Sequence, residues 1–272
     1  MARPIVFLSD LGLGDEFVGV CHSVIARIAP EARVVDLSHG VQPTDVSLGA
    51  MLLAECVPYA PADAVFLGVV DPGVGTDRKA IAVQTVGDRL LVGPDNGLLS
   101  LAWEALEGAG AAFEIMSQEV VLSPVSSVFH GRDVFAPAAA HLAAGLPAED
   151  LGPALDPESL VRITLPEPDV DDGVVRCQAL DVDRFGNVRL NVRIAHLEAA
   201  GLGDEPVVLV GSPAASATAR RIPTYSRVGS GEYGLIVDAW GWVTVSRFEA
   251  SAGDGLMIGR DDLVWIGRPD GG

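Results

Sequence analysis

The sequence has few basic residues, and their scarcity limits the partners that the protein can bind. Only 18 of its 272 residues are Lys or Arg, against 37 Asp or Glu, so the formal net charge is −19. Lys79 is the only lysine. Because binding to the phosphates of a nucleic acid requires clustered cations, we expect no nucleic-acid partner. An acidic protein tolerates a cationic small molecule, but net charge does not identify one.

Cysteine and long apolar runs are also scarce. Cys21, Cys56 and Cys177 are too few and too scattered for a disulfide framework or a zinc site. No uninterrupted apolar run is long enough to span a bilayer, and the first residues lack the pattern of a secretion signal. Hydrophobic residues nevertheless make up 49% of the chain, enough for a substantial core. We therefore expect a globular, cytoplasmic protein that does not bind membranes.

The histidines do not form a known metal-binding motif. His39, His130 and His141 are not at metal-ligand spacing, and the sequence contains no H-E-x-x-H helix. No Ser-His-Asp or Cys-His signature of nucleophilic catalysis stands out either. The sequence therefore predicts no metal site.

Apolar runs and helical patterns alternate through the first part of the chain. Buried strands are expected at 4–8, 33–37, 64–68, 80–83 and 90–92, and helices after Asp15, after the turn 42–45, at 98–106 and at 134–142. This alternation predicts an α/β domain over residues 1–165, with a largely parallel sheet and helices on both faces.

The character of the chain changes after 166–173, a stretch rich in Pro, Asp and Gly that we interpret as a linker. Short apolar runs separated by turns follow at 174–180, 207–210, 234–237, 242–245 and 263–266. They predict a smaller all-β domain over residues 173–272, either a barrel or a sandwich.

The turn after the apolar run 64–68 carries the strongest candidate for chemistry. Asp71 follows this strand closely, at the edge where open α/β sheets bind ligands. Pro72 and two glycines turn the chain tightly. Arg78 then follows as a fixed cation that could hold the carboxylate. The alternative interpretation is a surface turn with an incidental ion pair.

Two further carboxylates lie on the loop that ends the first strand. Asp10 and Asp15 could hold a ribose diol and an ammonium group, while Asp15 could also cap the next helix. Gly12 and Gly14 begin a dinucleotide-like pattern, but Phe17 stands where its third glycine belongs. We therefore do not expect a Rossmann-type NAD site.

His130 and the stretch 183–187 each allow two interpretations. His130 lies in a turn before a helix, where it could relay a proton or orient a water, or serve only as a structural residue. Phe185 and Asn187 could stack on and hydrogen-bond a purine. Gly186-Asn187 by itself, however, is typical of a hairpin turn.

Taken together, these stretches resemble the S-adenosyl-L-methionine hydroxide adenosyltransferases, which are relatives of the fluorinases and chlorinases. The resemblance covers nearly the whole chain and rests on several motifs in one order. These are Ser-Asp-Leu-Gly at 9–12, Val-Asp-Pro-Gly-Val-Gly at 70–75 with Arg78, Gly-Pro-Asp-Asn-Gly at 93–97, Phe-His-Gly-Arg-Asp at 129–133 and Phe-Gly-Asn at 185–187. It implies an N-terminal α/β domain, a C-terminal β-barrel and a homotrimer. The sites would lie between the N-terminal domain of one subunit and the C-terminal domain of the next.

The resemblance also implies roles for residues of the first domain. Asp71, Arg78 and His130 match the Asp-Arg-His triad of the hydrolase members. Asp10 would hold the ribose hydroxyls, and Asp15 would lie near the methionine ammonium.

In the second domain, the resemblance places Asp183 near the same ammonium and brings Phe185 and Asn187 to the adenine. Ala239-Trp240-Gly241 stands where many members have Ser-Ser-Gly or Ser-Arg-Gly for the methionine carboxylate. Arg247 remains and could compensate for the missing hydroxyl.

Within this family, Asp71 favours water over halide as the nucleophile. The fluorinase has a tyrosine at the matching position, and a carboxylate would repel a halide strongly in a low-dielectric pocket. The sequence thus predicts hydrolysis of S-adenosyl-L-methionine to adenosine and L-methionine, with this compound as substrate and no cofactor. The alternatives are a halide-dependent adenosyltransferase and a non-catalytic binder of adenosyl ligands.

Overall fold

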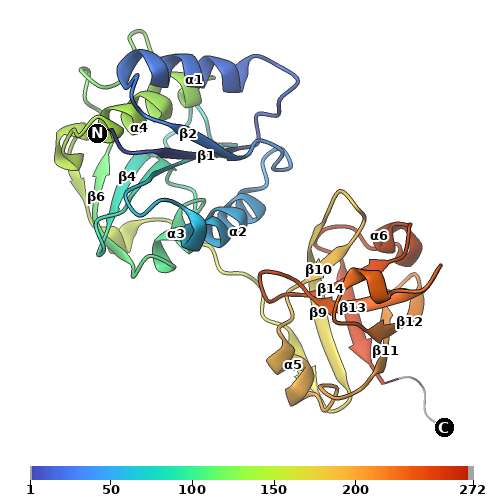
Figure 1. Ribbon diagram of the computed structural model, residues 1–272. Helices are drawn as coiled ribbons and strands as arrows, with labels where there is room; N and C mark the ends of the chain where they lie inside the picture. The colour runs from blue at the N-terminus through green and yellow to red at the C-terminus, as the bar shows by residue number, and fades with distance from the viewer. Residues whose placement is uncertain (1, 269–272) are drawn as a thin grey trace. The chain divides into compact units, whose positions relative to one another are not determined.

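The computed structural model describes residues 2–268 and divides into two compact units, residues 1–164 and 165–272 (Figure 1). The stretch 166–173, interpreted above as a linker, contains a short strand, β8 (Asp169–Asp171). This strand pairs with the long strand that follows it in the second unit. The second unit therefore begins before residue 173.

The first unit is built on a seven-stranded sheet in the order β2-β1-β3-β5-β4-β6-β7. β1 pairs in parallel with β2 and β3, and β3 pairs in parallel with β5, whereas β4, β6 and β7 are antiparallel to their neighbours. The strands are β1 (Ile5–Ser9), β2 (Val34–Ser38), β3 (Val65–Val69), β4 (Ala80–Thr85), β5 (Leu90–Pro94), β6 (Ala109–Glu114) and β7 (Ala154–Leu155). The predicted α/β domain with a largely parallel sheet is confirmed, and β6 and β7 are additional.

The central strands β1, β3 and β5 are buried because helices cover both faces of the sheet. Every residue of β1, β3 and β5 is buried. α1 (Phe17–Ile28) and α4 (Ala136–Ala143) lie on one face, and α2 (Val46–Cys56) and α3 (Ser100–Glu104) lie on the other (Figure 1). Cys21 and Ile25 of α1 pack in one core with Phe7 of β1 and with Phe135.

Several helix boundaries differ from the expectation. Asp15 does not cap α1, because the helix begins at Phe17 and its N-cap residue is Glu16, which makes no side-chain capping hydrogen bond. α3 is shorter than 98–106, and a π-helical turn (Gly131–Phe135) precedes α4. Asp45 does cap α2, since its side chain accepts the N–H of Leu48 at 2.9 Å.

The second unit is a closed β-barrel, which decides between the two all-β architectures predicted. Its strands follow the order β10-β14-β13-β12-β11-β15-β9, and β10 also pairs with β9, so the ring of seven strands closes. The ring consists of β9 (Val174–Val182), β10 (Val188–Leu190), β11 (Val207–Gly211), β12 (Ser216–Arg221), β13 (Tyr233–Val237), β14 (Val243–Arg247) and β15 (Leu263–Gly267). Two short helices, α5 (Ile194–Ala199) and α6 (Ala252–Leu256), accompany the barrel.

Short 3-10 turns lie at Val57–Tyr59, Ala148–Leu151, Pro157–Ser159 and Tyr225–Arg227. Within residues 2–268, no helix is both long enough and apolar enough to cross a membrane.

Candidate active site

The carboxyl ends of two neighbouring parallel strands bring Asp10 and Asp71 together. Ser9 of β1 is in register with Val69 of β3, and the N–H of Asp10 donates to the carbonyl of Val69 at 3.3 Å. Asp71 follows two residues after the end of β3. A pocket of about 130 Å³ lies at this edge and is lined by Asp10, Asp71 and His130, with apolar side chains around them.

Arg78 binds both oxygens of the Asp71 carboxylate. Its Nε donates to Oδ1 at 2.8 Å, and its Nη2 donates to Oδ2 and also to Nδ1 of His130, the latter at 2.7 Å. The guanidinium lies over the ring of Phe135, 5.0 Å from the ring centroid. The side chains of Arg78 and Asp71 are only 10% and 7% exposed, so this bidentate pair is shielded from solvent. The structure therefore assembles the predicted triad.

The contact with Arg78 fixes the protonation of His130. A guanidinium has only donors, so Nδ1 of His130 must accept, and the ring proton lies on Nε2. Burial lowers the pKa of His130 below its ordinary value of 6.5, and the charge of Arg78 adds to this shift. The carboxylates of Asp71 and Asp133 act in the opposite direction. At neutral pH, His130 is therefore an uncharged donor through Nε2–H.

The motif at 93–97 holds both ends of the loop that carries Asp71 and Arg78. This loop leaves β3 and passes β5 to reach β4, because β5 lies between them in the sheet. Asn96 donates from Nδ2 to the carbonyl of Val70 at 2.9 Å, and the N–H of Asp95 donates to the carbonyl of Lys79 at 2.9 Å. The two ends of the loop are thus fixed by consecutive residues.

Gly75 allows the loop to pack against the segment before His130. Its φ is +77°, and a Cβ there would lie 2.4 Å from the carbonyl oxygen of Ser127. Only glycine tolerates both the backbone conformation and this close approach. Asp133 also holds the segment that precedes His130. Its carboxylate accepts the N–H of Ser126 at 2.8 Å and pairs with Arg132.

Asp10 lies in the same pocket. Its Oδ2 accepts the N–H of Thr44 at 2.9 Å. Burial raises the pKa of Asp10 above its ordinary value, and the charge of Asp71 adds to this effect, while the hydrogen bond from Thr44 opposes it. Asp15 is exposed and does not line this pocket, so the structure does not bring the two loop carboxylates together.

In the second unit, the predicted binding residues share one pocket. Asp183, Phe185, Asn187 and Arg247 line a cavity of about 660 Å³ together with Tyr225. The sequence analysis missed Tyr225, because nothing in its local pattern marks it.

The stretch 183–187 is also the hairpin turn that was the alternative interpretation, and it joins β9 to β10. The Asp183 carboxylate accepts the N–H groups of Phe185 and Asn187 at 2.8 and 3.0 Å, and the amide of Asn187 at 2.8 Å. Phe185 is left 68% exposed, which offers an aromatic face to a planar ligand.

The stretch 239–241, where this sequence differs from the Ser-Ser-Gly or Ser-Arg-Gly of many family members, lies beside this cavity. Ala239 and Trp240 line an adjoining pocket that also contains Asp183 and Asn187. Arg189 is part of the same pocket, where it pairs with Asp238 at 2.8 Å. Arg189 is a further residue that the sequence analysis missed, because the short strand β10 that carries it was not predicted.

Comparisons with known proteins agree over almost the whole chain. The SAM hydroxide adenosyltransferase N-terminal domain matches residues 5–152, and the C-terminal domain of that family matches residues 177–265. The (R)-S-adenosyl-L-methionine hydrolase of Salinispora tropica is 45% identical over 268 residues, covering 96% of this chain and 97% of that protein. The fluorinase of an Actinoplanes species is 28% identical over 272 residues, covering 90% of this chain and 91% of that protein.

A solved structure also matches both units. The crystal structure of an uncharacterized conserved protein from Thermotoga maritima superimposes with a TM-score of 0.88 at 36% sequence identity. The superposition covers 97% of this chain and 100% of the Thermotoga maritima chain. The two units therefore have the same order and the same folds as in that solved structure.

The arrangement around His130 predicts two pKa shifts of opposite sign. Arg78→Met removes a cation that lowers the pKa of His130, so this pKa should rise toward its ordinary value. Asp71→Asn removes a carboxylate that raises it, so the pKa should fall further. NMR titration of the imidazole resonances measures both, and the nitrogen shifts should show the proton on Nε2. His141 is the internal control, because burial alone lowers its pKa. Shifts of the same sign in both variants would contradict the assigned geometry.

Proposed function

The chain belongs to the SAM hydroxide adenosyltransferase family, and we propose that it hydrolyses S-adenosyl-L-methionine to adenosine and L-methionine. The observation that carries this proposal is the shielded Asp71–Arg78–His130 cluster at the carboxyl edge of the sheet. The name of the Salinispora tropica relative, at 45% identity over nearly both full lengths, supports the same reaction.

The chemistry requires positioning more than acid catalysis. The methionine thioether leaves the sulfonium as a neutral group, so its departure needs no proton. Water must attack C5′ in line with the breaking C–S bond, and holding it there removes much of the barrier. We assign this work to Asp71, which binds the water and takes its proton, and to Nε2–H of His130, which donates to the water oxygen. Arg78 fixes the orientation of both.

This division of roles explains why water rather than halide is the nucleophile. A desolvated halide beside the Asp71 carboxylate would be repelled strongly in a site of low dielectric constant. The fluorinase relative is also the more distant of the two, at 28% identity. A non-catalytic binder is disfavoured because the Asp71 and Arg78 pair is fully assembled. The reaction needs no cofactor in this scheme, since the sulfonium itself provides the leaving group.

The substrate contacts are proposed on the same basis. Asp10 would bind the ribose hydroxyls beside the reacting carbon. Phe185 and Asn187 would meet the adenine, and Asp183 the methionine ammonium. The location of Asp183, Phe185 and Asn187 in one cavity supports the assignment of these three residues.

At the methionine carboxylate, Arg247 is proposed as the partner because it lines the same cavity. The hydroxyl that many family members supply is absent at Ala239. Asp15 keeps its assignment to the ammonium as a prediction that rests on the resemblance alone.

The test of the function is product identity. Purified protein incubated with S-adenosyl-L-methionine should form adenosine and methionine in equal amounts, at a rate that does not depend on chloride. Both sulfonium epimers should be supplied separately, because the name of the relative specifies the (R) form. Mass spectrometry distinguishes adenosine from 5′-chloro-5′-deoxyadenosine. The chlorinated nucleoside as main product would establish the halide-using alternative, and substrate bound without turnover would establish the binder.

We further propose a homotrimer in which each site combines the first unit of one subunit with the barrel of the next. The division of the proposed contacts supports it: the water-binding residues lie in the first unit, and the adenine contacts lie in the barrel. The cytoplasmic location stays a prediction, which the free thiols of Cys21, Cys56 and Cys177 support.

Shared sites predict that two impaired variants, each defective in a different unit, restore some fully active sites when they assemble together. Asp71→Asn removes the proton acceptor and should lower kcat by roughly 10²–10⁴-fold with little change in KM. Asn187→Ala should weaken binding of the adenine. Random association of the two chains in equal amounts should regenerate about a quarter of the sites. Steady-state assays of the co-expressed, differently tagged chains measure this recovery.

Asp10→Ala provides the matched control for the mixing experiment. Its lesion lies in the same unit as Asp71, so mixing Asp10→Ala with Asp71→Asn chains should regenerate no complete site. Recovery in this control, or a monomer in light scattering at assay concentration, would contradict sites shared between subunits.

A further inference from the structure

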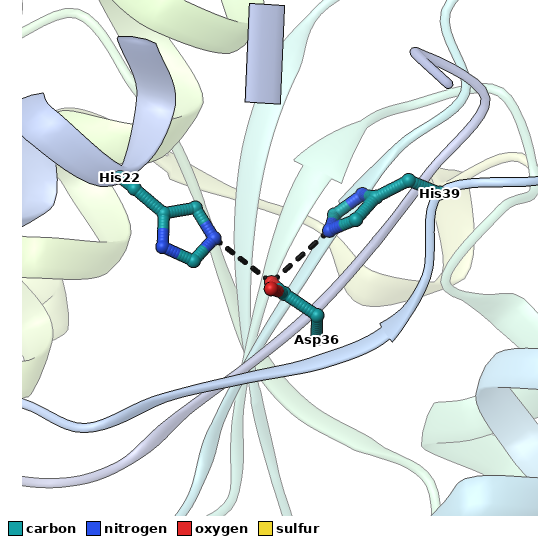
Figure 2. Close-up of side chains that lie close together, drawn as sticks. All are labelled: His22, Asp36 and His39. Atoms are coloured by element: carbon teal, nitrogen blue, oxygen red, sulfur yellow. Dashed lines mark hydrogen bonds and ion pairs between the residues drawn. The ribbon is translucent and has the colours of Figure 1, made fainter. Parts of the chain in front are cut away.

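Outside the candidate active site, two histidine side chains converge on one carboxylate oxygen of a third residue (Figure 2). His22 lies on α1, Asp36 on the edge strand β2, and His39 just after β2. Nε2 of His22 is 2.9 Å from Oδ1 of Asp36, and Nε2 of His39 is 3.0 Å from the same atom. We propose that this cluster binds a divalent transition-metal ion of the zinc type.

The spacing of the three atoms fits such an ion. Their ligand atoms all lie within 4.8 Å of one another. Around a tetrahedral ion with bonds of about 2.0–2.1 Å, neighbouring ligand atoms are about 3.3 Å apart. The contacts at 2.9 and 3.0 Å need to lengthen by only a few tenths of an ångström to admit the ion.

The ring of His39 is already held as a metal ligand would be. Its side chain is 2% exposed, and the ring packs edge-on against Phe7 with centroids 4.7 Å apart. Nδ1 lies 2.7 Å from the hydroxyl of Ser9, which can accept a hydrogen bond from Nδ1–H, so that the ring proton is on Nδ1 and the Nε2 lone pair is left for the ion. Among the described residues, this buried Nε2 has no well-directed hydrogen bond, although it faces Asp36. An ion would satisfy it.

The donor set selects the class of metal. Two imidazoles and one carboxylate suit zinc and its neighbours, whereas calcium and magnesium prefer oxygen ligands only. The side chains of His22 and Asp36 are 33% and 43% exposed, so the ion has a path from solvent and room for a water ligand.

This proposal departs from the expectation that the protein has no metal site. That expectation compared His39 with His130 and His141 and did not consider His22. His22 and Asp36 are 14 residues apart in the sequence, and the fold brings the His22 imidazole of α1 to 2.9 Å from the Asp36 carboxylate of β2.

The ion would act on stability rather than in the reaction. None of its ligands lines the pocket of Asp71. It would tie α1 to β2 and to the loop that begins at His39, whose carbonyl accepts the N–H of Gly12 at 2.8 Å. Binding to the folded state alone raises the free energy of unfolding in proportion to the logarithm of the free zinc concentration. The proposal does not rest on the hydrolase function.

The test uses the full chain without a histidine tag, stripped with a chelator and titrated with Zn²⁺ in a calorimeter. The parent should bind about one ion per chain, and Zn²⁺ should raise the midpoint of thermal unfolding. His22→Gln and Asp36→Asn should each weaken binding at least about tenfold and remove most of the thermal shift. Both replacements keep a polar side chain of similar size, and circular dichroism verifies that they fold.

His141→Gln is the matched control, since it removes a part-buried histidine of the same unit outside the cluster, and it should bind Zn²⁺ as the parent does. Co²⁺ in place of Zn²⁺ should give visible absorption bands that His22→Gln weakens. Absence of saturable binding in the parent would overturn the proposal. Equal binding by the parent, His22→Gln and Asp36→Asn would also overturn it, because the ion would then be adventitious.

Discussion

The buried contact between Arg78 and Asp71 orients the carboxylate and the imidazole that face the pocket. A shielded ion pair is tolerated only when its remaining hydrogen-bonding capacity is used. Here Arg78 donates to Asp71 and to His130 and lies over Phe135, so its charge is compensated on several sides. The same contact forces the neutral tautomer of His130 and presents one carboxylate and one N–H donor to the pocket. A water between them would find an acceptor for its proton and a donor for its oxygen.

The sheet explains how so compact a cluster forms from distant segments. β1 and β3 end side by side, so Asp10 and Asp71 meet without any long loop. The next connection passes the end of β5, where Asp95 and Asn96 fix it at both ends. The main chain at Gly75 then touches the segment that leads to His130. The motif at 93–97 and Gly75 of the motif at 70–75 thus each have a structural role in holding the triad.

The sequence predicted best those features that depend on residues close together in the chain. Apolar runs predicted the parallel strands, and the short separation of Asp71 and Arg78 predicted their ion pair. His130 is 52 residues from Arg78, so its contact with that residue depended on the resemblance to a family rather than on any pattern. The prediction of Asp15 as a helix cap was wrong, because α1 begins one residue later than the pattern suggested. β12, with its small and polar residues, carries no apolar signal, and the cluster of His22, Asp36 and His39 forms only through tertiary packing.

The central claim is that Asp71 directs a water molecule to C5′ and does not itself attack the carbon. Both of its oxygens are engaged by Arg78, which favours this reading. A single turnover with enzyme in excess, carried out in ¹⁸O-labelled water, tests it most directly. Adenosine should carry ¹⁸O at the 5′ position in the first turnover, while the peptide containing Asp71 stays unlabelled. Unlabelled adenosine together with ¹⁸O in the Asp71 carboxylate would show a covalent ester intermediate and would rule out direct attack by water.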